Sequence, residues 1–387
     1  MLVASCAYEG IVDAPQADST GYFLHSYDDA RLRFRATAER LASGHAGAEI
    51  DHLAVASATD DDLTIDYVYL PATRSPKKLV IFTSGVHGAE AFVGSGVQEM
   101  LMTTWLPSLD FSETSVLVIH SLNPWGYRHG RRVTEHNVDL NRNLSIEPAL
   151  FQTANDAYRE LDEFLNPKHA VSGFDVNTDV YELYSEVASL GETKLRDATL
   201  MGQYEFDAGI YFGGREPEPQ KQALEELLLR VIDQHEAVFL MDLHTGYGER
   251  GRMHFFGDVG IDGAAAMQTV FAGYQIDSAA TNPDFYETKG DLIVYVGQLA
   301  AAKTYLGTTL EYGTLDSQTL EGGMRSLLRM RLENQGVHFG YESDIVRSAV
   351  QRRFGELFNP QDNVWRRQIL DATSRAVPDL VARFQAL

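Results

Sequence analysis

Two apolar runs on either side of a helical segment constrain the fold of this chain more than any other feature. Residues 78–84 and 115–121 are rich in β-branched and large apolar side chains, which is typical of buried strands. The segment from about 91 to 105 between them is predicted to be a helix. Because a strand–helix–strand order implies parallel strands with a right-handed crossover, the sequence predicts an α/β protein.

Further elements extend this pattern on both sides. Two antiparallel neighbours are expected at 49–57 and 63–69, and two more strands at 237–243 and 304–312. The stretch 244–303 is expected to be rich in loops. Helices are predicted at 28–44, 151–165 and 221–236, and over most of 341–387.

These elements predict a single mixed, largely parallel twisted sheet flanked by helices, in one domain over residues 1–387. Its motif-bearing core would span about 78–315, with the segments 1–77 and 341–387 packed on it. The polar region that ends in Gly213–Pro219 is more loop than a compact core needs. We therefore expect it to carry substrate contacts or part of an interface.

The composition excludes several classes of function. The chain has 387 residues, 44% hydrophobic and 22% charged, as in an ordinary globular protein. Its net charge of -23 disfavours nucleic acid and anionic membranes as partners. The single cysteine, Cys6, excludes a disulfide framework and a cysteine-based zinc site. No stretch approaches the roughly 20 apolar residues of a membrane helix, and no secretory signal begins the chain, so we expect a cytoplasmic protein unless a signal segment lies upstream.

A histidine and a glutamate, His87 and Glu90, stand three positions apart just after the strand 78–84. The loop edge of an α/β sheet is where ligands bind, and imidazole and carboxylate both bind zinc. His244 ends another strand and completes a set of three ligands that leaves a fourth position for water. A chance turn and a hydrogen-bonded strand-end histidine are the alternative interpretations. Asp242, on the same strand as His244, is expected to point to the opposite face.

A second motif, residues 123–143, combines an Asn-Pro-x-Gly turn with the sequence Asp-Leu-Asn-Arg. Arginine forms paired, charge-assisted hydrogen bonds to a carboxylate. A protein this acidic needs such a local cluster to hold an anionic substrate end. Pairing with the chain's own carboxylates is the alternative for Arg128 and Arg131, and it fits Arg142 less well.

Glu311 closes the late strand 304–312, again at the loop edge of the sheet. A carboxylate beside a zinc-bound water can take its proton and pass it to a leaving amine. The alternative is a glutamate that is simply solvated at the end of a strand.

The order of these motifs resembles that of the zinc carboxypeptidase family. The resemblance rests on His87-x-x-Glu90, Asn-Pro-x-Gly, Asp-Leu-Asn141-Arg142, Asp-Leu-His244-Thr-Gly and Leu-Glu311-Tyr-Gly, which together span residues 83–314. The run Asn-Val-Asp-Leu-Asn-Arg-Asn at 137–143 is most similar to an uncharacterised bacterial branch. Each motif alone is a weak signal, and five in the family's order are a strong one.

The resemblance implies an activity and a role for these residues. His87, Glu90 and His244 would hold Zn²⁺, and Glu311 would act as general base and general acid. The substrate would be a peptide or acyl-amino acid with a free carboxylate, and the reaction would hydrolyse the adjacent amide bond. A metallocarboxypeptidase is the activity that the resemblance favours.

It also implies how the substrate is held. Asn141 and Arg142 would bind the terminal carboxylate. Arg132 would polarise the scissile carbonyl, and it is preferred to Arg131 because its spacing to Asn141 is closer to that of the family. No motif assigns the family's lid tyrosine, for which the candidates are Tyr286, the preferred one, and Tyr247 and Tyr295.

Two other functions remain open. An N-acyl amino acid deacylase, similar to the desuccinylase and aspartoacylase branch of the same superfamily, would share the metal ligands and the Asp-Leu-Asn-Arg motif. A non-catalytic carboxylate-binding protein is less consistent with the sequence, because silent relatives usually lose one of these residues. Side-chain specificity, a second metal and the oligomeric state are not predicted.

Overall fold

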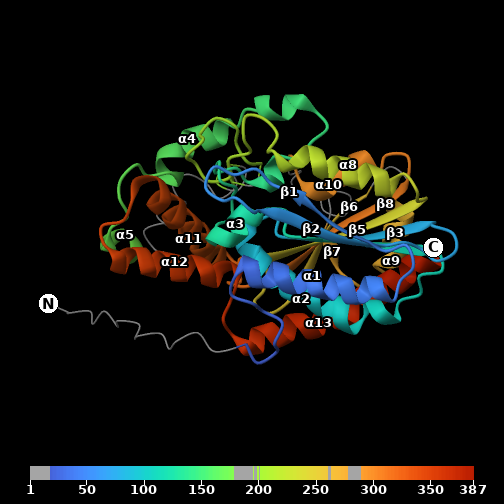
Figure 1. Ribbon diagram of the computed structural model, residues 1–387. Helices are drawn as coiled ribbons and strands as arrows, with labels where there is room; N and C mark the ends of the chain where they lie inside the picture. Colours follow the sequence, from blue (N-terminus) through green and yellow to red (C-terminus); the bar gives the residue numbers. More distant parts are fainter. Residues whose placement is uncertain (1–17, 178–194, 196–197, 200, 260–262, 278–288) are drawn as a thin grey trace.

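The computed structural model describes residues 18–177, 195, 198–199, 201–259, 263–277 and 289–387. In this part of the chain one eight-stranded sheet has the order β1-β2-β4-β3-β5-β8-β6-β7 (Figure 1). The strands are β1 (Glu49–Ala54), β2 (Thr64–Leu70), β3 (Lys78–Ser84), β4 (Thr114–His120), β5 (Ala237–Gly246), β6 (Met253–Val259), β7 (Ile276–Asp277) and β8 (Thr304–Gly313). The central strands β4, β3, β5 and β8 are parallel, whereas β1–β2, β2–β4 and β6–β8 pair antiparallel. The predicted mixed, largely parallel sheet is confirmed.

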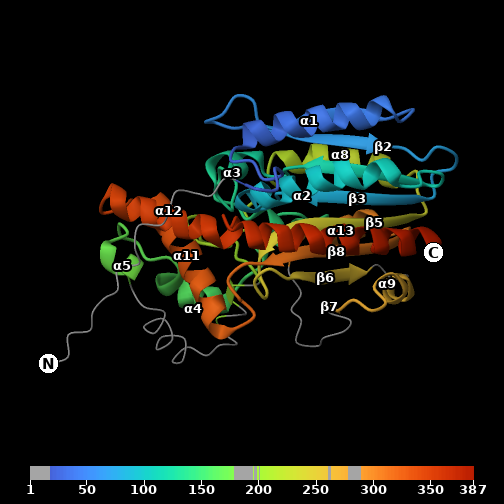
Figure 2. The same cartoon turned by 90° about the horizontal axis from the view of Figure 1, so that it is seen from below.

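Helices cover both faces of this sheet (Figures 1 and 2). The α-helices are α1 (Tyr27–Ser43), α2 (Ala91–Thr104), α3 (Pro124–His129), α4 (Asp156–Leu165), α5 (Gly173–Asn177), α8 (Gln220–Ile232), α9 (Ala264–Val270), α10 (Leu292–Leu299), α11 (Leu320–Phe339), α12 (Asp344–Phe358) and α13 (Asn363–Ala386). Short 3-10 helices are η1 (Gly88–Glu90), η2 (Leu106–Ser108), η3 (Leu140–Arg142) and η4 (Pro148–Gln152). Helices α1, α2 and α13 lie on one face and α8 and α10 on the other, while α4, α5, α11 and α12 lie beyond one end of the strands.

The alternation of side chains along each central strand divides the core into two layers. On β3, Val80 and Phe82 pack into the layer with α1, α2 and α13. Leu79 and Ile81 pack into the layer with α8 and α10. Because both faces are covered, the central strands are apolar throughout, and this made them recognisable in the sequence.

The expectation of a loop-rich stretch at 244–303 was wrong, since β6, α9, β7 and α10 lie within it. Strand β6 contains Gly257 and Asp258, two residues that are uncommon in strands. Helix α10 has the sequence Leu-Ile-Val-Tyr-Val-Gly-Gln-Leu and packs among α8, β5, β6 and β8. A helix that is apolar on all sides shows no 3.6-residue period.

The other predicted elements are present with small shifts at their ends. Helix α4 begins at Asp156, after η4, and α8 ends at Ile232. The segment from 341 onward is helical as α12 and α13. Of the helices in the described ranges, none combines the length and the apolar character required to cross a bilayer.

Candidate metal centre

Two parallel strands bring the three predicted metal ligands together. His87 immediately precedes η1, the short helix that follows β3, and Glu90 is its last residue. His244 lies near the end of β5. One ligand atom from each of the three side chains lies within 4.8 Å of the others, and all three residues are buried. Gly88 permits this turn, because a Cβ there would stand 2.1 Å from the backbone carbon of Gly126 in α3.

The two imidazole rings are held with the same nitrogen facing Glu90. The Nδ1 atom of His87 lies 2.8 Å from Glu90 Oε1, and Nδ1 of His244 lies 3.1 Å from Oε2. The outer nitrogens bond to carboxylates, Nε2 of His87 to Asp139 at 3.0 Å and Nε2 of His244 to Asp242. In the metal-binding form, a proton on each Nε2 would leave the lone pair of each Nδ1 directed at the shared space. The Nη2 atom of Arg132 also lies 2.7 Å from Nε2 of His87.

The expectation that Asp242 points away from His244 was wrong. Residues two positions apart on a strand lie on the same face, and Asp242 accepts a hydrogen bond from His244. Thr83 of β3, which pairs in register with Asp242, donates to its Oδ1 at 2.6 Å. Asp242 is therefore fixed between a neighbouring strand and the imidazole that it orients.

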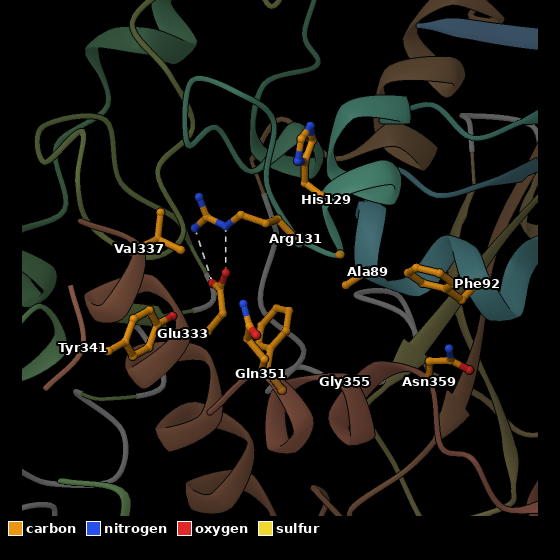
Figure 3. A pocket seen from close by; sticks show the side chains of 12 residues that line it. Ala89, Phe92, His129, Arg131, Glu333, Val337, Tyr341, Gln351, Gly355 and Asn359 are labelled. Carbon is orange, nitrogen blue, oxygen red and sulfur yellow. Dashed lines mark hydrogen bonds and ion pairs between the residues drawn. The ribbon is translucent and has the colours of Figure 1, made fainter. Parts of the chain in front are cut away.

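Arg132, rather than Arg131, reaches this cluster. Its guanidinium lies 3.0 Å from Oε1 of Glu90 and 3.2 Å from Oδ2 of Asp139. Arg131 turns the other way and pairs with Glu333 of α11 at 2.7 Å, in the wall of a separate cavity of about 320 Å³ (Figure 3).

Burial and charge act on the ionisable groups of the centre in opposite directions. Burial alone raises the pKa of Glu90, but the charges of His87 and His244 hold it well below its usual value. Burial likewise opposes ionisation of Asp139, and Arg132 lowers the pKa of that carboxyl well below its ordinary range. These carboxylates are thus ionised and able to bind a cation.

Glu311 lies across the strand pair from His244, on β8. The residue is 8% exposed, and its Oε1 accepts a hydrogen bond from the backbone N–H of Tyr247 at 2.8 Å. Burial and the charge of Glu90 raise the pKa of Glu311 to about 7. A carboxyl group that titrates near neutral pH can both accept and return a proton.

The residues predicted to bind the carboxylate differ in their surroundings. The side chain of Asn141 caps helix α10: its Oδ1 accepts from Leu292 N at 2.8 Å and its Nδ2 donates to Asp291 at 3.3 Å. Arg142 is 6% exposed, and its guanidinium donates to the carbonyl of Asn141 at 2.7 Å. The side chain of Arg142 is therefore available for a further partner.

The tyrosine candidates also differ. Tyr286 lies outside the described residues. Tyr295 is buried and its hydroxyl bonds to Glu225 of α8. Tyr247 is 48% exposed, and its backbone N–H, rather than its side chain, bonds to Glu311. Tyr211, which no motif indicated, borders the centre with its ring centre 6.0 Å from the Arg132 Cζ atom.

One protein family matches almost the whole length of the described fold. A family described as "Protein of unknown function (DUF2817)" matches residues 23–372. The chain belongs to this family. No curated protein matches the sequence.

Solved structures with a similar arrangement are distant. Bovine thrombin-activatable fibrinolysis inhibitor, in complex with tick carboxypeptidase inhibitor, is 12% identical over 86% of this chain and 98% of its own, with a TM-score of 0.46. Carboxypeptidase A from Helicoverpa armigera is 12% identical over 86% and 74%, with a TM-score of 0.40. Murein-tripeptide amidase MpaA from Escherichia coli O157 is 16% identical over 74% and 92%, with a TM-score of 0.35. Likeness at this level transfers neither a site nor an activity.

Proposed function

We propose that this chain is a zinc-dependent hydrolase that cleaves an amide bond next to a free carboxylate, as a metallocarboxypeptidase does. The observation that carries the proposal is the orientation of the two imidazoles. Both Nδ1 atoms face the Glu90 carboxylate, and Asp139 and Asp242 bind the outer nitrogens. Structural packing alone does not require two buried histidines to share this arrangement.

The donor set fits zinc. His87, Glu90 and His244 would hold the ion through two nitrogens and a carboxylate, a ligand set that leaves a position open in catalytic sites. The His87 Nδ1 atom is buried without a hydrogen-bond partner, although it lies 2.8 Å from Glu90 Oε1. Zinc bound there would supply a Lewis acid and lower the pKa of a coordinated water.

Three side chains of the protein would bind the substrate and transfer the proton. The Arg132 guanidinium would bind the scissile carbonyl oxygen and the negative charge that develops on it, an effect worth roughly 3–4 kcal/mol for one well-placed donor. Glu311 would take the proton from the attacking water and deliver it to the leaving amine. Arg142 would bind the free carboxylate that adjoins the cleaved bond.

The proposal is tested by mass spectrometry of products from a mixed library of peptides and N-acyl amino acids. Zinc-loaded protein is compared with chelated protein and with the Glu311→Gln variant. Zinc-dependent release of single C-terminal residues is the expected result. Cleavage of N-acyl amino acids alone would identify a deacylase instead. Zinc binding without release of any product would contradict hydrolysis and favour a carboxylate-binding protein.

A further inference from the structure

A cavity of about 320 Å³ lies between the loop that follows α3 and the helices α11 and α12 (Figure 3). We call it the Arg131 cavity. Ala89, which belongs to η1, and Phe92 lie on one side of it, and Val337 and Tyr341 lie on the other. Its volume is at the lower end of the range for small-molecule sites, roughly 300–1,000 Å³. Of the described residues that line it, none is a proposed metal ligand, so the cavity is a site of its own.

An ion pair lines this cavity among apolar side chains. The Nε atom of Arg131 donates to Oε1 of Glu333 at 2.7 Å, and Nη2 donates to Oε2 at 3.3 Å. The two residues are only 8% and 7% exposed. Burial of such a pair often costs as much as the pair gains, and apolar side chains of similar size stabilise a fold equally well. Stability alone therefore does not explain an ion pair at this position, whereas recognition of a polar ligand does.

The ion pair leaves hydrogen-bonding capacity unused. The Nη1 atom of Arg131 has no hydrogen-bond partner among the described residues. The carboxylate of Glu333 accepts from Arg131 alone in the same part of the chain, and each of its oxygens can accept a further hydrogen bond. The pair thus offers one donor and two acceptors to a ligand in the cavity.

The matched charges of the pair determine which chemistry fits. A buried anion would be repelled by Glu333, and a buried cation would be repelled by Arg131. A neutral amide suits both groups, because its carbonyl accepts from a guanidinium and its N–H donates to a carboxylate. Phe92 and Phe354, which also line the cavity, offer rings against which an aromatic side chain can pack.

The rim of the cavity is open to solvent. Val337 is 47% exposed, and Gln351 is exposed as well. A chain that places one residue in the cavity can therefore continue outside it. We infer that the Arg131 cavity binds a peptide segment through one neutral backbone amide and one aromatic or large apolar side chain. This inference goes beyond the proposed function and does not depend on it.

The experiment measures binding of a neutral amide by fluorine NMR, without turnover. Zinc-loaded protein is titrated with N-acetyl-4-fluoro-L-phenylalaninamide, which has no free carboxylate, and with 4-fluorotoluene, which carries only the ring. The ratio of the two affinities gives the preference for the amide.

Three variants locate the binding. Gly355→Leu fills part of the cavity, and no described atom lies within 4 Å of a Cβ at this position in α12. The double variant Arg131→Met with Glu333→Leu replaces the ion pair by apolar side chains. Gly173→Leu in α5 is the matched control, because a Cβ there is equally free of described neighbours and the residue does not line the cavity.

Wild-type protein is expected to bind the amide about tenfold or more tightly than the ring alone, the usual effect of a hydrogen bond to a charged group. Gly355→Leu should abolish binding of both probes, and Gly173→Leu should change neither affinity. The double variant should still bind the ring and lose the preference for the amide, which a purely structural ion pair would not cause. Absence of binding to wild-type protein, or an unchanged affinity for the amide in folded Gly355→Leu, would overturn the inference.

The double variant decides the matter should Gly355→Leu fail to fold. Loss of the preference then supports the site, and its retention overturns it. These outcomes are separate from those of the hydrolysis assay, because the probe lacks the free carboxylate that the proposed reaction requires. A protein that hydrolyses nothing and shows the preference would keep the role of the cavity. A protein that releases C-terminal residues and binds neither probe would keep the proposed function and lose this inference.

Discussion

Two clusters of arginine, carboxylate and histidine each include a residue of the segment 128–132. They differ in the burial of their side chains and in how positive and negative charges are paired. The outer cluster consists of Asp28, Arg31, Asp60, Asp62, Arg128 and His129. The metal cluster consists of His87, Glu90, Arg132, Asp139, Asp242 and His244. Arg128 belongs to the outer cluster and Arg132 to the metal cluster, so one short segment contributes an arginine to each.

In the outer cluster every carboxylate contacts an arginine, and those of Asp28 and Asp62 are also exposed to water. Arg128 contacts Asp28 at 2.7 Å, Asp60 at 3.0 Å and Asp62 at 2.7 Å, and the side chains of Asp28 and Asp62 are 53% and 59% exposed. Arg31 binds Asp28 and Asp62 as well. Exposed pairs of this kind contribute little each and serve to hold the loop in place.

In the metal cluster the side chains are almost fully buried, and two imidazoles surround one carboxylate. His87, Glu90 and His244 are between 2% and 4% exposed. Burying such groups is costly unless a strong interaction compensates for it. The metal cluster is unusual because three buried ligand atoms converge in it, and not because it contains more charges. We therefore propose a chemical role for the metal cluster and a stabilising role for the outer cluster.

The largest expected effect on turnover is that of Glu311→Gln. Loss of the carboxylate that we propose to transfer the proton should lower kcat by a factor at the upper end of roughly 10²–10⁴. Zinc content, measured by mass spectrometry, should stay that of the wild type, because Glu311 is not among the three proposed ligands. Glu321→Gln, on an exposed carboxylate paired with Arg325, is the matched control and should retain full activity. Near-normal turnover in Glu311→Gln would remove this residue from the mechanism.

Arg132→Lys should have the next largest effect. Lysine keeps the charge but loses the planar pair of donors that reaches Glu90 and Asp139. We expect kcat to fall by roughly 10²–10³. Arg128→Lys, the same change in the outer cluster, should leave kcat unchanged, and equal losses from both substitutions would break the comparison between the clusters.

Asp242→Asn should act through the metal rather than through the substrate. The amide can no longer fix the proton on Nε2 of His244 as a carboxylate does, so zinc affinity should fall by roughly 10–100-fold. A competition titration with a chelator measures this. Excess zinc should restore activity to Asp242→Asn but not to Arg132→Lys, and unaltered zinc affinity in Asp242→Asn would show that Asp242 does not support the ligand.

The role of Asp242 also shows what the sequence could reveal. The apolar central strands and the positions of His87, Glu90, His244 and Glu311 at their ends follow local patterns, so the sheet and the grouping of these residues were predictable. The face of Asp242 was equally readable from the period of two along a strand, and the prediction misapplied that period.

Other features could not be read from local patterns. The strained conformation of Tyr211 depends on backbone pairing with Gln203, and its neighbour Phe212 pairs with Asp139, contacts that no spacing in the sequence reveals. The family-like spacing to Asn141 favoured Arg132 over Arg131, but it did not reveal the physical reason, which is that Glu333, far along the chain, binds Arg131.

The smallest expected effect is that of Asp60→Asn in the outer cluster. Burial raises the pKa of Asp60, but hydrogen bonds from His129, Arg128 and Thr59 lower it to about 2. A carboxylate with a lowered pKa stabilises the folded state above its ordinary pKa near 4 and loses this effect as the pH falls through about 2. Asp60→Asn should therefore lower the free energy of unfolding by about 1–2 kcal/mol at pH 7 and by less at pH 3, as measured in urea, with kcat unchanged. Asp51→Asn, on an exposed carboxylate of β1, is the control, and a loss of turnover in Asp60→Asn would mean that the two clusters are coupled.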